Sequence, residues 1–93
     1  MNIRFTDIED LTFPTVHSNG TSRSDLFEGY LEALRKVRDL TEAVQKIEFN
    51  ARDYYVQGPT AFQTAQDERR QIMFFIGHIN KYLEAHAEYL SQQ

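Results

Sequence analysis

One stretch near the middle of the chain, residues 52–59 ("RDYYVQGP"), groups side chains that suit a nucleotide base. Tyr54 and Tyr55 offer flat faces on which a base can stack, and Arg52 can stack or contact a phosphate. The amide of Gln57 can hydrogen-bond to a base edge. The alternative is that one tyrosine closes the end of a helical core while the other remains half exposed.

A second stretch, residues 17–23 ("HSNGTSR"), suits a phosphate or another anion. Gly20 allows the backbone a positive φ. Thr21, Ser22 and Arg23 then bring hydroxyls, free amide N–H groups and a guanidinium to a predicted helix start. Unpaired N–H donors and the helix dipole both favour negative charge at such a place. The alternative is an ordinary turn followed by an N-cap, and the stretch is not a P-loop because no GxxxxGK[ST] pattern is present.

Catalytic and metal-binding patterns are absent from the sequence. The three histidines, His17, His78 and His86, are widely separated, and no HExxH or paired-carboxylate motif occurs. The chain also contains no cysteine, so neither a disulfide framework nor a thiolate metal site is available. We therefore expect a protein that is not an enzyme and that needs no cofactor or metal.

Composition limits the class of protein and of partner. With 93 residues, of which 41% are hydrophobic and 26% charged, the chain fits one small folded domain. Ten basic and fourteen acidic residues give a net charge of −4, which argues against general binding to DNA or RNA. The longest apolar run, residues 72–77, is too short to span a membrane, and the N-terminus lacks a signal-peptide pattern. These features predict a cytoplasmic protein without a membrane partner.

Hydrophobic spacing predicts an all-α chain, folded as an antiparallel two-helix hairpin over a single domain, 1–93. We expect an extended arm and turn over residues 1–20, a helix over 22–50, a connecting turn over 51–58 and a helix over 59–91. Ser22 followed by Asp25 is an N-terminal capping signature, and Pro59 suits the first position of a helix. Apolar residues then recur at spacings of three and four. The first stripe contains Leu26, Tyr30, Leu34, Val37, Leu40 (or Thr41), Val44, Ile47 and Ala51. The second contains Phe62, Ala65, Arg69, Ile72, Ile76, Ile79, Leu83, His86 and Leu90, in which Arg69 and His86 interrupt the apolar residues.

Apolar residues outside these stripes predict further contacts. They are Phe75, Tyr82 and Tyr89, seven residues apart along the second helix, and Phe27 and Leu31 on the first helix. The apolar residues of the arm, Ile3, Phe5, Ile8, Leu11 and Phe13, could fold back and cover these flanks. We favour contact with another copy of the chain, because exposed apolar patches often mark interfaces. Head-to-tail packing of hairpins would then join the 17–23 stretch of one chain to the 52–59 stretch of its neighbour.

The two stretches together resemble small proteins of tailed bacteriophages and prophages. The resemblance lies in an H-x-N-G-T-S start at residues 17–22 and an R-D-Y-Y-x-Q-G-x-x-A-F centre at residues 52–62, and it covers roughly residues 17–70. In size and layout the chain is also similar to phage sponge proteins of the anti-CBASS and anti-Thoeris type. Those are small helical oligomers that sequester cyclic nucleotide immune signals at subunit junctions.

This resemblance implies a non-catalytic sponge for a small cyclic nucleotide in an infected bacterial cell. It implies a phosphate- or ribose-binding group of His17, Asn19, Thr21, Ser22 and Arg23, and a base-binding group of Arg52, Tyr54, Tyr55 and Gln57. The alternatives are an inhibitor or adaptor that binds a host protein, in which "RDYY" is an interface hot spot, and a structural phage component.

Overall fold

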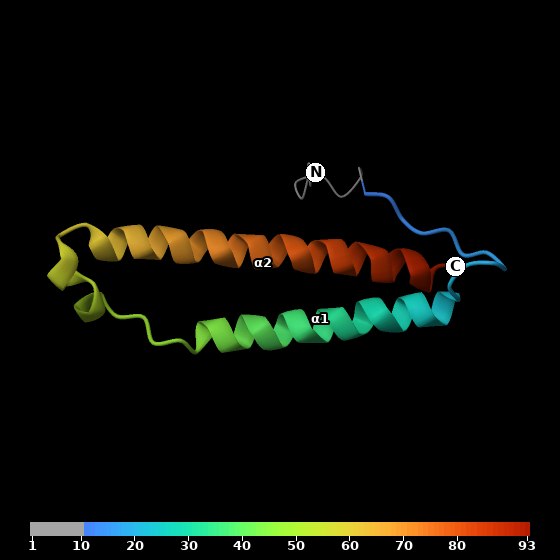
Figure 1. Ribbon diagram of the computed structural model, residues 1–93, viewed down its shortest axis with the longest axis horizontal. Coiled ribbons are helices and arrows are strands. Elements are labelled where there is room, and N and C mark those ends of the chain that lie inside the picture. The colour runs from blue at the N-terminus through green and yellow to red at the C-terminus, as the bar shows by residue number, and fades with distance from the viewer. Residues whose placement is uncertain (1–10) are drawn as a thin grey trace.

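The computed structural model describes residues 11–93 and shows an elongated helical hairpin (Figure 1). Helix α1 spans Arg23–Gln45 and helix α2 spans Ala61–Ser91. Between them lie two short 3-10 helices, η2 (Ala51–Asp53) and η3 (Tyr55–Gln57). The prediction of an all-α antiparallel hairpin is confirmed for the described residues, which contain no strand.

The helix boundaries differ from those predicted at the connecting end. Helix α1 ends at Gln45 rather than at residue 50, and Ile47, which the periodicity placed on the buried stripe, is 59% exposed. After the C-cap residue Lys46 the chain becomes extended, which carries Phe49 back toward α2. Ring packing of Phe49 on Tyr54 and Phe62 therefore takes the place of the last predicted helical turn.

The starts of the two helices follow different rules. Ser22 caps α1 as its sequence signature predicts, since its hydroxyl accepts a hydrogen bond from the backbone N–H of Asp25 at 3.1 Å. Helix α2 begins at Ala61, so Pro59 lies before the helix rather than at its first position. Gly58, with φ 142°, makes the bend that Pro59 follows. The connecting segment thus spans residues 46–60.

The C-terminal ends of the two helices are joined by arginines from the opposite helix. An Nη1–H of Arg23 donates to the carbonyl of Leu90 at 3.1 Å, and an Nη2–H of Arg69 donates to the carbonyl of Val44 at 2.7 Å. Neither helix has a basic residue in its own last turn. Each of these two carbonyls also accepts a backbone N–H, that of Ile47 at Val44 and that of Gln93 at Leu90. Each arginine therefore adds a second donor to a carbonyl of the last turn and places positive charge at the negative end of the partner helix's dipole.

The interior is thin along the middle of the hairpin. Among the described residues only Ile76, Ala87, Leu90 and His86 are buried. Aromatic packing is concentrated at the two ends. We call the group of Phe13, Tyr30, Tyr82, His86 and Tyr89 the terminal cluster, and the group of Phe49, Tyr54, Phe62 and Arg69 the turn cluster.

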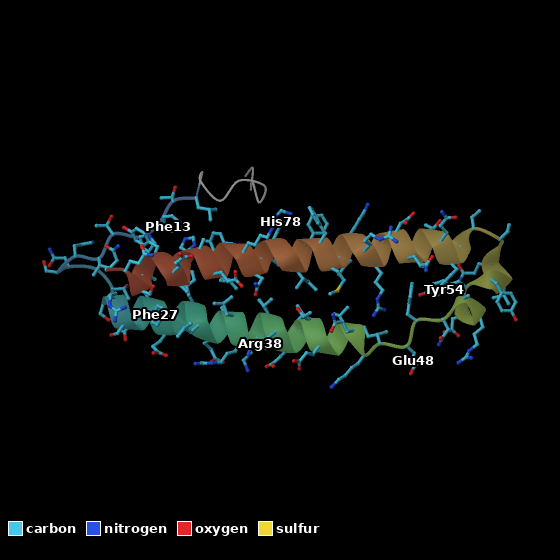
Figure 2. All side chains as sticks on the ribbon, turned by 180° about the vertical axis from the view of Figure 1, so that it is seen from behind. Phe13, Phe27, Arg38, Glu48, Tyr54 and His78 are labelled. Atoms are coloured by element: carbon cyan, nitrogen blue, oxygen red, sulfur yellow. The ribbon has the colours of Figure 1, made fainter. Side chains whose placement is uncertain are left out.

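The arm contributes to the terminal cluster. The ring of Phe13 stacks on Tyr89, with centroids 4.7 Å apart, and meets the edge of His86 at 4.8 Å (Figure 2). Leu11 is partly buried. The arm therefore folds back onto the helices in this part, as the less favoured of the two interpretations held, whereas Ile3, Phe5 and Ile8 lie outside the described residues. None of the helices in residues 11–93 combines the length and apolarity that crossing a bilayer requires.

The arginine contacts predict a difference between two adjacent residues. Replacing Arg69 by Met keeps the apolar stem but removes the hydrogen bond to Val44, so we expect a loss of about 1.5–3 kcal/mol in the free energy of unfolding. Arg70 is the matched control, since its guanidinium is exposed and pairs with Asp67 at 3.0 Å. Arg70→Met should cost no more than about 0.5 kcal/mol. Urea titrations measure both, and equal losses would contradict this role for Arg69.

The contact of the arm predicts that Phe13 stabilises the hairpin. Phe13→Ala removes a ring that packs on Tyr89 and His86, and we expect a loss of about 1–3 kcal/mol, below that of a fully buried Phe. Val16→Ala, in the same arm but 36% exposed, should change stability by less than about 0.5 kcal/mol. Thermal melts followed by circular dichroism would test this, and an unchanged melting temperature for Phe13→Ala would show that the arm does not contribute.

Candidate ligand-binding site

The two candidate stretches lie at opposite ends of the hairpin. The connecting segment closes one end, whereas the turn at residues 17–20 leads into α1 at the other end, beside the C-terminus of α2 (Figure 1). The 31 residues of α2 alone extend over roughly 45 Å at about 1.5 Å per residue. One chain therefore cannot bring both stretches to the same ligand, as the sequence predicts.

Tyr54 is an element of the turn cluster. Its ring centroid lies 5.5 Å from that of Phe49 and 5.9 Å from that of Phe62, and the Phe49 and Phe62 centroids are 5.3 Å apart (Figure 2). The guanidinium of Arg69 lies 4.8 Å from the centre of the Phe49 ring. Tyr54 thus has the packing role that the alternative interpretation of "RDYY" assigned to one of the two tyrosines.

The other candidate residues of the connecting segment face solvent. Tyr55 is 64% exposed and the neighbouring Val56 is 77% exposed, while Arg52 and Gln57 are exposed as well. Two successive 3-10 helices carry these residues, so the backbone direction changes within a few residues. The segment therefore presents an aromatic ring, a guanidinium and an amide on one short piece of chain.

At the other end, the turn at residues 17–20 is compact. The N–H of Gly20 donates to the carbonyl of His17 at 3.1 Å, and the imidazole of His17 folds over the glycine. A Cβ on Gly20 would lie 2.8 Å from Nε2 of His17, so the glycine provides room for that ring. Gly20 does not adopt the positive φ that a glycine allows. Among the described residues only Gly58 has a positive φ. His17, Asn19 and Thr21 are exposed.

Ser22 and Arg23 are both occupied by the fold. The hydroxyl of Ser22 is the N-cap acceptor of α1. The guanidinium of Arg23 binds the Leu90 carbonyl and lies 5.6 Å from the centre of the Phe27 ring. A phosphate at this end would therefore share Arg23 with the end of α2, and it would lie near the carboxylate of Asp25 in the first turn. Among the predicted ligands in this stretch, the exposed donors that the fold does not use are those of His17, Asn19 and Thr21.

The sequence did not reveal the terminal cluster as one unit. His86 is only 1% exposed, and its Nδ1 lies 2.9 Å from the carbonyl of Tyr82. Its ring is 4.8 Å from Tyr30 and 4.2 Å from Tyr82. Burial, together with Tyr82, raises the pKa of Tyr30 above its ordinary value of 10.0, so this hydroxyl is neutral at physiological pH. The spacing placed His86 on the second stripe and Tyr82 and Tyr89 on the flank beside it, but it gave no sign that Phe13 and Tyr30 would meet them.

Two open grooves follow the line between the helices. One, of about 540 Å³, has a mixed polar and apolar lining. Its residues are Arg38, Thr41, Glu42, Met73, Ile76, Gly77, Asn80 and Glu84. The other, of about 330 Å³, is mainly apolar and lies nearer the termini, with Leu26, Gly29, Tyr30, Ala33 and Leu83 in its lining. Within residues 11–93 no group of three histidine or carboxylate side chains could hold a metal ion.

The different surroundings of the two adjacent tyrosines predict different effects on stability. Tyr54→Ala removes a ring from the turn cluster and should lower the free energy of unfolding by about 2–4 kcal/mol. Tyr55→Ala removes an exposed ring and should change it by less than about 0.5 kcal/mol. Denaturant unfolding of the two variants gives a direct comparison, and equal effects would place both rings in the same environment.

Comparisons with known proteins provide no relative on which to base a function. No protein family, characterised protein or solved structure matches this chain. The assignment of a function therefore depends on the side chains that the fold leaves available.

Proposed function

We propose that this chain is a non-catalytic binding protein that captures a small cyclic nucleotide, as a phage sponge does in the cytoplasm of an infected bacterial cell. The observation that supports this proposal is the exposed group of Arg52, Tyr55 and Gln57 in the connecting segment. Tyr54 stabilises the turn, so Tyr55 is left with most of its ring in water. An exposed ring beside a guanidinium and an amide is suited to stacking on a base and hydrogen-bonding to its edge.

Affinity requires more than this group can provide. Stacking on one ring contributes roughly 1–3 kcal/mol, whereas binding a signal at nanomolar concentration needs roughly −12 kcal/mol. The exposed His17, Asn19 and Thr21 of a neighbouring chain could supply donors to the phosphates or ribose. Ser22 and Arg23 are proposed as ligands with smaller roles, because both already hold parts of the fold. The proposed site therefore lies between subunits.

A second proposed function is binding to a host protein as an inhibitor or adaptor. It is favoured by the large apolar residues exposed on α2, which include Phe74 at 62% and Phe75 at 55%. Exposed apolar patches often mark protein interfaces. In this case Arg52 and Tyr55 would act as interface anchors rather than as ligands of a base.

Titration calorimetry with a panel of cyclic di- and trinucleotides and cyclic ADP-ribose isomers tests the nucleotide proposal. We expect Tyr55→Ala to weaken binding of the recognised nucleotide by about 1–3 kcal/mol, because a stacking surface is lost. Tyr55→Phe keeps the ring and should retain most of the affinity. Arg52→Ala should weaken binding and reduce its salt dependence if the guanidinium contacts a phosphate.

The outcomes distinguish the two proposed functions. Heat from a nucleotide that depends on Tyr55 supports the sponge. The absence of heat from every nucleotide, for a folded protein at high concentration, would contradict it. Capture of one defined host protein that Phe74→Glu abolishes would then support the inhibitor or adaptor.

A further inference from the structure

We propose that a second copy of this chain packs antiparallel against one face of the hairpin, where large side chains of each copy fill the apolar groove of the other. We call this surface, formed by Leu40 of α1 and Ile72, Phe75 and Ile79 of α2 together with the apolar groove, the association face. The result is a symmetric four-helix bundle. It shares Phe75 with the association predicted from sequence but does not use the other residues of that predicted contact, which are Tyr82, Tyr89, Phe27 and Leu31.

The large side chains of this face are exposed in the single hairpin. Leu40 is 49% exposed, Ile72 52%, Phe75 55% and Ile79 42%. With about 3.6 residues per turn, Ile72 and Ile79 lie two turns apart on one row of α2, and Phe75 lies beside them. The charged residues of α2 after Arg70 are Lys81, Glu84 and Glu88. By the same helical geometry, these three residues project from the side of α2 opposite to the association face. The part of that face on α2 therefore carries no charged side chain after Arg70.

The same face is hollow nearer the termini. On α1, Gly29 and Ala33 lie on the same row as Leu40, at spacings of four and seven residues. On α2, Leu83 continues the row of Ile79 four residues further on. Gly29, Ala33 and Leu83 line the apolar groove of about 330 Å³. A Cβ on Gly29 would meet no atom within 4 Å, so this part of the face has free space.

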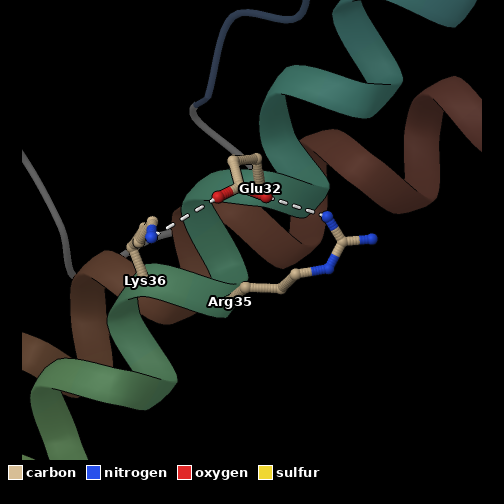
Figure 3. Close-up of polar contacts among 3 residues, drawn as sticks. All are labelled: Glu32, Arg35 and Lys36. Atoms are coloured by element: carbon tan, nitrogen blue, oxygen red, sulfur yellow. Dashed lines mark hydrogen bonds and ion pairs between the residues drawn. The ribbon is translucent and has the colours of Figure 1, made fainter.

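Lys36 is the charged residue of α1 between these two parts. Its ammonium lies 3.7 Å from a carboxylate oxygen of Glu32, which also binds Arg35 at 2.9 Å (Figure 3). All three side chains are more than half exposed, so this ion pairing contributes little stability by itself. It does draw the charge of Lys36 along α1, away from Leu40. The ammonium of Lys36 can therefore remain at the rim of the association face when a second copy packs on it.

The arrangement of large and hollow parts identifies the partner as a second copy. A twofold axis near Ile79, about midway between Phe75 and Leu83, would place the large part of each chain on the hollow part of the other. Such self-complementarity is what an isologous interface requires. The hairpin also needs to bury more apolar surface, because only four of its described residues are buried and a core of this size is marginal. Four antiparallel helices around one core satisfy both conditions.

This association does not depend on nucleotide binding, although the two are compatible. Antiparallel packing directs the connecting segment of one copy toward the residue 17–23 end of the other. The proposed nucleotide site between subunits also requires the two chains to be antiparallel. A dimer that binds no nucleotide would therefore contradict the proposed function while leaving the association face supported.

Sedimentation equilibrium of the full chain tests the face directly. We expect a dimer at micromolar concentration and at least about a 100-fold increase in its dissociation constant for Ile72→Glu or Ile79→Glu, since each buries a charge in an apolar contact. Ile47→Glu is the matched control, because Ile47 is 59% exposed and lies in the connecting segment, beyond the end of α1. A wild-type monomer that is fully helical, or a dimer unaffected by the two face variants, would overturn the proposal.

Gly29→Leu separates association from stability. Leucine favours a helix more than glycine does, and a Cβ at this position meets no atom within 4 Å, so helix content should not fall. The added side chain fills the groove that the partner would occupy, and we expect at least about a 10-fold increase in the dissociation constant. A Gly29→Leu dimer as tight as wild type would exclude this groove from the contact.

A disulfide tests the position of the twofold axis. The chain has no cysteine, so a single Ile79→Cys introduces the only thiol. Residues near a twofold axis lie close to their own copies, and mild oxidation should link Ile79→Cys chains into covalent dimers. Val56→Cys, in the connecting segment, should remain largely unlinked at the same protein concentration. Equal linking of the two variants would contradict an axis near Ile79.

Discussion

The hairpin depends on two hydrogen bonds from arginine to the ends of helices. Arg23, the first residue of α1, binds Leu90 near the end of α2, and Arg69, in α2, binds Val44 near the end of α1. Each contact fixes one end of one helix against the other helix, so together they set the register of the pair. A relative shift by even one turn, about 5.4 Å, would break both bonds. It would leave two guanidiniums without these carbonyls in partly buried positions, which is costly.

Once this register is set, the aromatic residues can close both ends. Arg69 lies over Phe49, which contacts Tyr54 and Phe62, so the arginine and the turn cluster support each other. At the other end Phe13 covers the helix row that contains His86 and Tyr89. The middle of the hairpin has no equivalent cluster. This is where large apolar residues remain exposed, and it is the part of the molecule in which a second chain would contribute most.

The connecting segment divides structure and proposed function between adjacent residues. Tyr54 packs inward and Tyr55 remains in solvent, although the two have the same chemistry and consecutive positions. The difference arises because η2 and η3 change the backbone direction between them. The opposite end shows a similar division, in which Ser22 and Arg23 hold the helices while His17, Asn19 and Thr21 face solvent. Residues that a short motif groups together therefore differ in whether they are available to a ligand.

The sequence by itself determined the class of fold and its main elements. The recurrence of apolar residues at three and four positions gave two helices, and the Ser22–Asp25 signature gave the start of the first within a residue. These features are local, because helical periodicity and capping depend on residues within one or two turns. The capping bond could thus be anticipated from neighbouring residues, whereas the apolar content of the arm left two possibilities open, contact with its own helices or contact with another copy.

Tertiary structure decided the features that require residues distant in the sequence to meet. The early end of α1 could not be predicted, because the pattern through Ile47 is helical and only the position of Phe62 favours the departure of Phe49. The role of Arg69 was hidden for the same reason, since its place on the second stripe gives no sign that the Val44 carbonyl lies beside its guanidinium. The periodicity also assigned Ile72 and Ile79 to the buried seam. Two helices contact each other along a narrow line, so the flank of a wide apolar stripe remains exposed, and only the packing of the pair decides which residues form that flank.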